Sequence, residues 1–161
     1  MPDVKIGDMG LSKRKLESFV SGNMRGTLPW MAPELLPTLD GAPSGKVNEK
    51  IDVYSFGVCL WEIWTNGSEP YPNLESSQLM YGLMSNTLHL DMSCQPDPDW
   101  VDLINWCMAR DPAERPSFTD IAWKLEDMLQ KWSQPEERCE PCIVSAATWA
   151  SSNWDNDLPM V

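Results

Sequence analysis

Histidine and positive charge are both scarce in this 161-residue chain, and each shortage excludes a class of function. His89 is the only histidine, so neither a Ser-His-Asp triad nor a histidine metal cluster can be built, and we interpret it as a surface-loop residue. Lys and Arg number 12 against 24 Asp and Glu, which gives a formal net charge of −12. Because such a surface repels phosphates, we expect no nucleic-acid partner and no anionic-membrane partner.

Long apolar runs and a paired cysteine pattern are also missing. No run of 18 apolar residues occurs, so we expect no membrane span. The five cysteines include one C-x-x-C, Cys139-Glu140-Pro141-Cys142, but no second pair accompanies it, which disfavours a zinc or redox site. The start Met1-Pro2-Asp3 does not resemble a secretory leader, and we therefore expect a cytoplasmic protein with reduced thiols.

Apolar residues make up 42% of the chain and nine of them are Trp, which is enough for the core of one domain. We predict a strand over residues 3–6, a long loop to residue 31, and mainly helices beyond it. The first helix is expected over residues 49–64, because Asn48 is a good N-cap. Its apolar residues cover every face, which predicts a helix at the centre of the fold.

Three later helices follow from local signals. One is expected over residues 74–84, the next begins at Pro98 after the cap Asp97, and Ser117 with Asp120 forms a capping box for the last. In these three helices apolar residues recur at helical spacing. We assign them, including their Trp and Met residues, to the core. They are Leu79, Met80, Leu83, Met84, Trp100, Leu103, Ile104, Cys107, Met108, Phe118, Ile121, Ala122, Leu125, Met128, Leu129 and Trp132.

Two short motifs near the beginning of the chain carry chemistry. In Asp8-Met9-Gly10 the carboxylate is a donor that Mg²⁺ prefers, and the glycine allows a sharp backbone turn. By itself this triplet is an ordinary turn after Val4-Lys5-Ile6. The triplet becomes informative because a second motif, Ala32-Pro33-Glu34, stands at the far end of the loop-like stretch that follows it.

Together the motifs resemble the activation segment of protein kinases. Ile51-Asp52-Val53-Tyr54-Ser55-Phe56-Gly57 with Leu60-Trp61-Glu62 looks like the central helix of the kinase C-terminal lobe. Asp111-Pro112-Ala113-Glu114-Arg115-Pro116-Ser117-Phe118 looks like its Arg-bearing loop. The resemblance spans nearly all of residues 3–132. The motif sequences are most similar to the tyrosine-kinase-like group, especially plant-type Raf-like MAP kinase kinase kinases.

The resemblance implies a mainly α fold, namely a partial kinase C-terminal lobe with the activation segment and the late helices, and without the N-terminal lobe. Residues 1–132 would form this partial domain. Residues 133–161 hold five acidic residues against one basic residue, and we predict a disordered acidic tail.

Specific roles follow from the same resemblance. Asp8 and Gly10 match the segment that binds ATP and Mg²⁺, with Asp8 as the metal ligand. Thr27 matches the residue that positions the catalytic-loop Asp, and Thr27-Leu28-Pro29-Trp30 favours Ser or Thr substrates. Glu34 and Arg115 match a structural ion pair, and Asp52 matches the residue that holds the catalytic-loop backbone.

Ser12, Ser18 and Ser21 lie between the two motifs and are candidate phosphorylation sites, or else plain polar loop residues. Residues 1–31 carry five basic residues against three acidic ones, a local charge of +2. Lys13-Arg14-Lys15 would therefore hold a phosphate or simply face solvent.

Two residues depart from the family pattern: Met9 stands where Phe or Leu is usual, and Met108 where Trp is usual. The Gly-rich loop, the phosphate-pairing Lys and the catalytic-loop Asp do not occur in the sequence. We therefore expect an ATP- and Mg²⁺-dependent protein Ser/Thr kinase by family, truncated here and inactive alone, with a protein substrate or an upstream kinase as partner. The alternatives are a non-catalytic binding module that acts through its helical surface, and a relic with little function.

Overall fold

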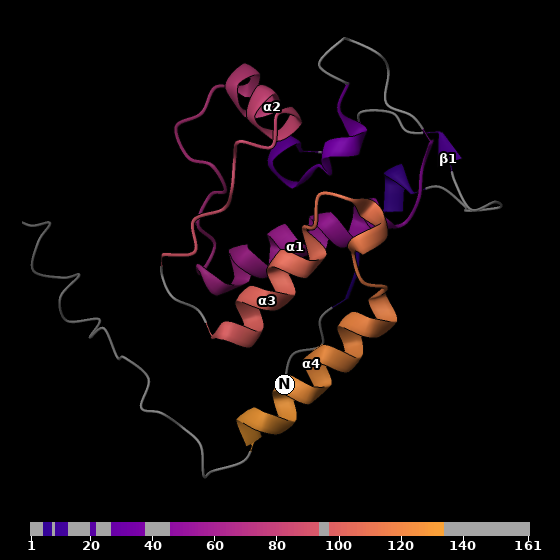
Figure 1. The fold of residues 1–161 in the computed structure, drawn as a ribbon, viewed down its shortest axis with the longest axis vertical. Helices are drawn as coiled ribbons and strands as arrows, with labels where there is room; N and C mark the ends of the chain where they lie inside the picture. Colours follow the sequence, from indigo (N-terminus) through magenta and orange to yellow (C-terminus); the bar gives the residue numbers. More distant parts are fainter. Residues whose placement is uncertain are drawn as a thin grey trace, which may run out of the picture. The chain divides into compact units, whose positions relative to one another are not determined.

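The computed structural model describes residues 5–7, 9–12, 20–21, 27–37, 46–93 and 97–133 of a mainly α chain (Figure 1). The chain divides into two compact units, residues 1–127 and residues 128–161. The α-helices are α1 Lys50–Trp64, α2 Ser76–Met84, α3 Pro98–Cys107 and α4 Phe118–Ser133. Short 3-10 turns are η1 Met9–Leu11, η2 Leu28–Trp30, η3 Pro33–Leu35 and η4 Pro112–Glu114, and the strands are β1 Val20–Ser21 and β2 Lys46–Val47.

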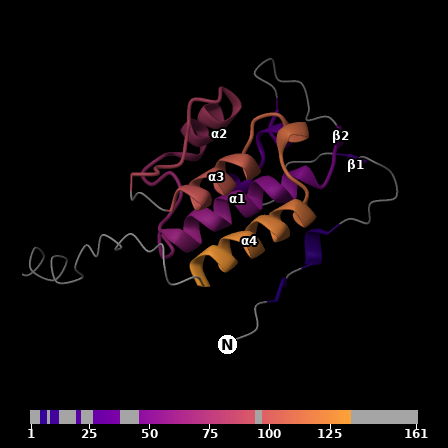
Figure 2. The ribbon, with the colours of Figure 1, turned by 60° about the horizontal axis from the view of Figure 1, so that its bottom comes forward.

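Helix α1 begins at Lys50, one residue later than predicted, and its N-cap is Glu49 rather than Asn48. The Asn48 Oδ1 still accepts a hydrogen bond from the Lys50 backbone N–H at 3.0 Å. The helix lies beside α3, as both ribbon views show (Figures 1 and 2). Val53 and Val58 are fully buried, whereas Ile63 is 67% exposed. The apolar residues on every face of this helix are therefore not all buried, because hydrophobicity does not guarantee a neighbour to pack against.

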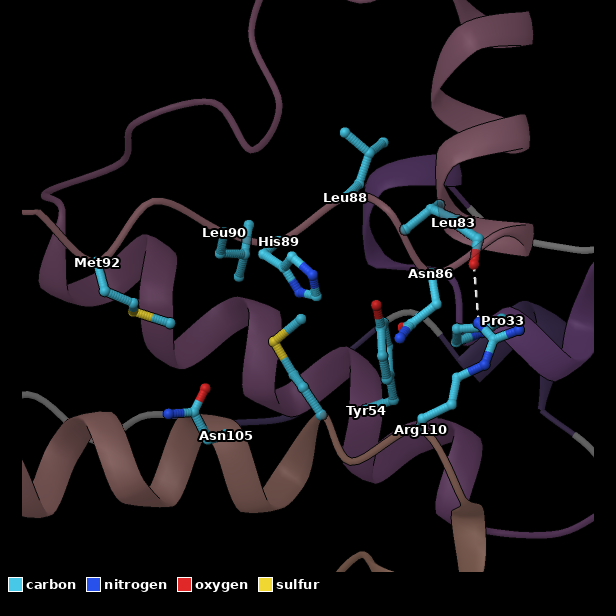
Figure 3. Close-up of a pocket in the computed structure, with 11 residues that line it drawn as sticks. Pro33, Tyr54, Leu83, Asn86, Leu88, His89, Leu90, Met92, Asn105 and Arg110 are labelled. Carbon is cyan, nitrogen blue, oxygen red and sulfur yellow. Dashed lines mark hydrogen bonds between the residues drawn. The ribbon is translucent and has the colours of Figure 1, made fainter.

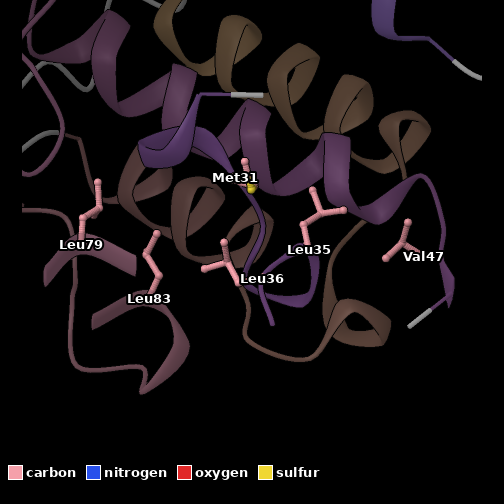
Figure 4. Packing of buried hydrophobic residues seen from close by; sticks show 6 residues of the cluster. All are labelled: Met31, Leu35, Leu36, Val47, Leu79 and Leu83. Atoms are coloured by element: carbon pink, nitrogen blue, oxygen red, sulfur yellow. The ribbon is translucent and has the colours of Figure 1, made fainter. Parts of the chain in front are cut away.

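Helix α2 starts two residues later than predicted. The Gln78 side-chain oxygen accepts a hydrogen bond from the Glu75 backbone N–H, and this cap leaves Leu74 outside the helix. Leu79 and Leu83 are buried as predicted, in an apolar cluster with residues that precede α1 (Figure 4). The buried members of this cluster are Met31, Leu35, Leu36, Val47, Leu79 and Leu83.

Tryptophans join elements through their ring N–H groups. Trp61 donates to the Asp91 carbonyl at 2.8 Å, and Trp100 donates to the Leu60 carbonyl at 3.2 Å. Trp106 and Trp123 are exposed, so the assignment of all tryptophans to the core is wrong for them. An indole has a polar edge as well as an apolar face, and it can therefore lie at a boundary with solvent.

Helix α4 has the predicted capping box, since Ser117 Oγ accepts from the Asp120 N–H and the Asp120 carboxylate accepts from the Ser117 N–H. Hydrogen bonds from the Ser117 side chain and then its backbone lower the pKa of Asp120. The apolar stripe is narrower than predicted. Ile121 and Met128 are buried, but Phe118, Ala122, Leu129 and Trp132 are exposed.

The beginning of the chain departs from prediction at two places. Lys5 and Ile6 form no strand, because a strand needs a hydrogen-bonded neighbour, while Asp3 and Val4 lie outside the described residues. Within the predicted loop, β1 pairs antiparallel with β2. Ser133 ends α4, so the tail predicted for residues 133–161 begins inside the helix, and residues 134–161 lie outside the description. In the described segments, no helix is both long and apolar enough to cross a membrane.

Gly57 allows α1 and α3 to approach closely. A Cβ at this position would lie 2.7 Å from Met108 Cγ and 2.9 Å from Cys107 Cβ. Overpacking typically costs about 1–3 kcal/mol, and the better helix propensity of Ala returns at most about 1 kcal/mol. We expect Gly57→Ala to lower the free energy of unfolding in urea denaturation, and Gly57→Val to lower it further.

Ile63→Ala on the same helix is the control. Because the Ile63 side chain is 67% exposed, we expect its removal to change stability by no more than about 0.5 kcal/mol. A Gly57→Ala variant more stable than the parent would contradict this account of the helix contact.

Candidate functional site

The end of the second motif is held by an ion pair between Glu34 and Arg115. Glu34 lies in η3, and its two carboxylate oxygens accept from Arg115 NH1 at 2.6 Å and NH2 at 2.8 Å. The Arg115 side chain is fully buried and that of Glu34 is 23% exposed. The structure thus contains the ion pair that the sequence predicts, in the bidentate geometry that suits a guanidinium and a carboxylate.

Every N–H of the Arg115 guanidinium has an acceptor. Besides the two bonds to Glu34, Nε donates to the Ala109 carbonyl, NH1 to the Lys50 carbonyl and NH2 to the Arg110 carbonyl. A guanidinium has five N–H donors, so none remains for another ligand. The charge also lies 5.1 Å from the centroid of the Tyr54 ring, within cation–π range. Arg115 is therefore a structural residue.

Helix α1 holds the preceding turn, η2. Ser55 Oγ donates to the Trp30 carbonyl at 2.7 Å, and Trp30 Nε1 donates to the Glu62 carboxylate at 3.2 Å. Ser55 and Glu62 stand seven residues apart, which places them on one face of the helix. Neither residue belongs to the set predicted to be functional, although their spacing in the sequence indicates a shared face.

The backbone of Lys50 belongs to the same assembly. Its carbonyl accepts from Arg115, and its Nζ donates to the Arg115 carbonyl. The first turn of α1 is thereby connected to the loop before α4. Sequence reasoning missed Lys50, because a backbone acceptor is the same for every residue type.

Thr27, Gly10 and Ser12 are exposed. Thr27 stands at the N-cap of η2, and its carbonyl accepts from the Trp30 N–H at 3.0 Å. Ser12 follows η1, and its Oγ lies 3.5 Å from the sulfur of Met9.

Asp8, the predicted Mg²⁺ ligand, and the candidate phosphosite Ser18 lie outside the described residues. Ser21 is in β1. Asp52 lies in the first turn of α1, where partial burial and then the charge of Glu49 raise the pKa of its carboxyl. The structure brings Glu34 and Arg115 together, whereas no hydrogen bond joins Thr27 or Asp52 to that pair within the described segments.

Removing the Glu34 carboxylate should destabilise the fold strongly. Glu34→Ala leaves a fully buried guanidinium without its counterion, and breaking a buried pair in this way typically costs about 3–5 kcal/mol. We expect a loss of stability near the lower end of that range. Because Glu34 is partly exposed, water can replace some of the hydrogen bonds that its carboxylate makes with Arg115. Urea denaturation followed by circular dichroism measures this loss.

Lys124→Ala is the matched control. It breaks the Lys124–Asp99 ion pair, whose side chains are 28% and 32% exposed, and pairs of this kind contribute about 1 kcal/mol or less. Equal losses for Glu34→Ala and Lys124→Ala would show that burial of Arg115 does not determine the strength of its pair.

Comparison with known proteins agrees with this geometry. The family model described as "Protein tyrosine and serine/threonine kinase" matches residues 2–125. "Mitogen-activated protein kinase kinase kinase 12" of Rattus norvegicus is 38% identical over 123 residues, which is 76% of this chain and 13% of the relative. "Serine/threonine-protein kinase CTR1" of Arabidopsis thaliana is 36% identical over 138 residues, which is 85% of this chain and 16% of the relative.

The human "Mitogen-activated protein kinase kinase kinase 13" is 36% identical over 123 residues, which is 76% of this chain and 12% of the relative. The chain thus spans less than a fifth of the length of the curated relatives it matches. The family match covers the Glu34–Arg115 pair, the α1 face that holds Trp30, and α3. The chain belongs to the protein kinase family, with relatives among the MAP kinase kinase kinases and the plant Raf-like Ser/Thr kinases.

Proposed function

We propose that this chain is the substrate-side part of a protein Ser/Thr kinase domain. Family membership supports the reaction class, and the Glu34–Arg115 pair is the observation that carries the structural assignment. The pair anchors the end of the segment that begins at Asp8, while Ser55 and Glu62 anchor Trp30 three residues after Thr27. The segment on which a protein substrate would dock is therefore attached to the helical core at two points.

Asp8 would hold the Mg²⁺ of bound ATP, because a carboxylate is the hard oxygen donor that this ion prefers. The metal would neutralise charge on the transferring phosphoryl group. Thr27, exposed before η2, would orient the catalytic base. The base and the Lys that pairs with the phosphates do not occur in these 161 residues, so we place phosphoryl transfer in a longer protein that includes this chain.

The names of the relatives suggest a class of substrate. Two of them are called kinases of MAP kinase kinases, and we propose that the protein containing this chain transfers phosphate to Ser or Thr of another protein kinase. Ser12, Ser18 and Ser21 are the proposed acceptors of an activating phosphate within the chain itself.

The test isolates the native protein with an antibody raised against the 161-residue chain. We expect the isolate to transfer phosphate from ATP to Ser or Thr of a MAP kinase kinase only when Mg²⁺ is present, and the chain alone to transfer none. In the full coding sequence, Asp8→Asn should lower transfer by about 100-fold or more, since a catalytic metal is worth several kcal/mol. Asp3→Asn, five residues earlier in the chain, is the control and should leave the rate unchanged. Full activity of the Asp8→Asn protein would refute the proposal.

Exposed apolar side chains favour a second candidate, a non-catalytic binding module. Ile63, Tyr81, Trp106 and Trp123 are each at least 42% exposed within residues 1–127, and such residues are enriched in protein interfaces. If this function is correct, the 161-residue chain captures a kinase or its substrate from solution, and Tyr81→Ser weakens the capture. A chain that engages no purified MAP kinase kinase would rule this candidate out.

A further inference from the structure

A pocket of about 290 Å³ lies inside residues 1–127, and Thr27 is not among the residues that line it. Its walls come from α1, from the loop after α2, and from the end of α3 (Figure 3). Leu90, Met92 and Met108 contribute apolar surface, while Asn86 and Arg110 contribute polar groups. This combination of an apolar cavity and a few convergent polar groups is typical of small-molecule sites.

Three of the polar groups that line the pocket lie at one end of it. Figure 3 shows Tyr54, Asn86 and Arg110 at that end, with Met92 and Asn105 at the other. Asn86 adopts a positive φ of 57°, a conformation uncommon outside glycine, at the turn after α2. The end of the pocket where a phenol, an amide and a guanidinium meet is called its polar end.

Arg110 is oriented by the chain yet keeps free donors. Its NH1 donates to the Leu83 carbonyl at 2.8 Å and its NH2 to the Met84 carbonyl at 2.9 Å, at the end of α2. Two of its five N–H groups are used in these bonds, and among the residues that the structure describes no acceptor is found for the other three, which leaves them for a ligand. Arg115 differs here, because all five of its donors are occupied. Of the two guanidiniums, Arg110 is the one available to a ligand.

Two arginines act on the Tyr54 hydroxyl at this end. Burial raises the pKa of the Tyr54 hydroxyl, and the charges of Arg115 and Arg110 oppose that effect, whereas Glu34 acts with it. Among the described residues that line the pocket there is no carboxylate. In a chain of net charge −12, a cavity lined by Arg110 and free of acidic side chains favours an anionic ligand over a cationic one.

We propose that this pocket binds a small organic carboxylate with an apolar body. The carboxylate faces Arg110 and Asn86 at the polar end, and the body packs on Leu90 and Met108. A cavity near 300 Å³ is at the lower end of the range for small-molecule sites, which limits the body to about the size of one aromatic ring with a short chain. This site requires no phosphoryl transfer, and it stands whether or not the proposed kinase function is correct.

The experiment titrates the isotope-labelled 161-residue chain with 4-phenylbutyrate and with its uncharged amide, 4-phenylbutyramide. The NMR signals of the His89 ring and of the Asn86 and Asn105 side-chain amides report on the pocket. We expect saturable shifts with the carboxylate and at least about tenfold weaker binding of the amide, because bonds to a charged acceptor are the stronger ones. Equal affinity for both compounds, or no binding of either, would overturn the proposal.

Two variants identify the groups responsible. Arg110→Gln should weaken binding of the carboxylate by about tenfold and leave the affinity for the amide unchanged. The variant would then no longer prefer the charged compound. Lys124→Gln, which also removes one positive charge but lies outside the pocket, should have no effect. If the two variants weaken binding equally, net charge and not Arg110 is responsible, and the proposal fails.

A third variant covers the case in which Arg110→Gln loosens α2. Asn105 is exposed on α3 and lines the pocket, so Asn105→Phe fills the cavity without disturbing the core. We expect it to abolish binding of both compounds while the helical circular dichroism is retained. Undiminished carboxylate binding to this variant would place the ligand elsewhere and refute the site.

Discussion

The fold of the first unit depends on one buried guanidinium. Arg115 is only 2% exposed, and its five N–H donors reach Glu34, the carbonyl of Lys50 and two carbonyls of its own loop. An unpaired charge in the interior is costly, so these partners must be in place together. The end of the kinase-like segment, the first turn of α1 and the loop before α4 are therefore assembled as one unit.

Arg110, only five residues earlier, has a different environment. It is exposed, it caps the C-terminal carbonyls of α2, and it retains donors beside a cavity. Tyr54 links the two arginines, because its ring lies against Arg115 while the residue also lines the pocket. Residue type alone does not distinguish a structural arginine from a ligand-binding one. The number of donors left after folding does.

Local signals predicted the helix starts well. Asp97 and the Ser117–Asp120 pair cap helices as expected, because a cap involves residues only two or three positions apart, whereas Glu49 takes the cap position predicted for Asn48. The predicted faces were less accurate. Ile63 and Leu129 follow apolar periodicity yet are exposed, since periodicity places a side chain on a face but does not supply a surface to cover it.

The sequence by itself determined the family, the helical class and the pairing of Glu34 with Arg115, because these are recorded in residue identities at set positions. Only the tertiary structure decided how Arg115 is satisfied, that Ser55 and Glu62 hold Trp30, and that a cavity opens beside Arg110. These features use backbone carbonyls or join segments far apart in the chain, 25 residues in the case of Ser55 and Trp30 and 32 in the case of Trp30 and Glu62. A carbonyl is common to every residue, so its role appears only when packing brings a donor to it.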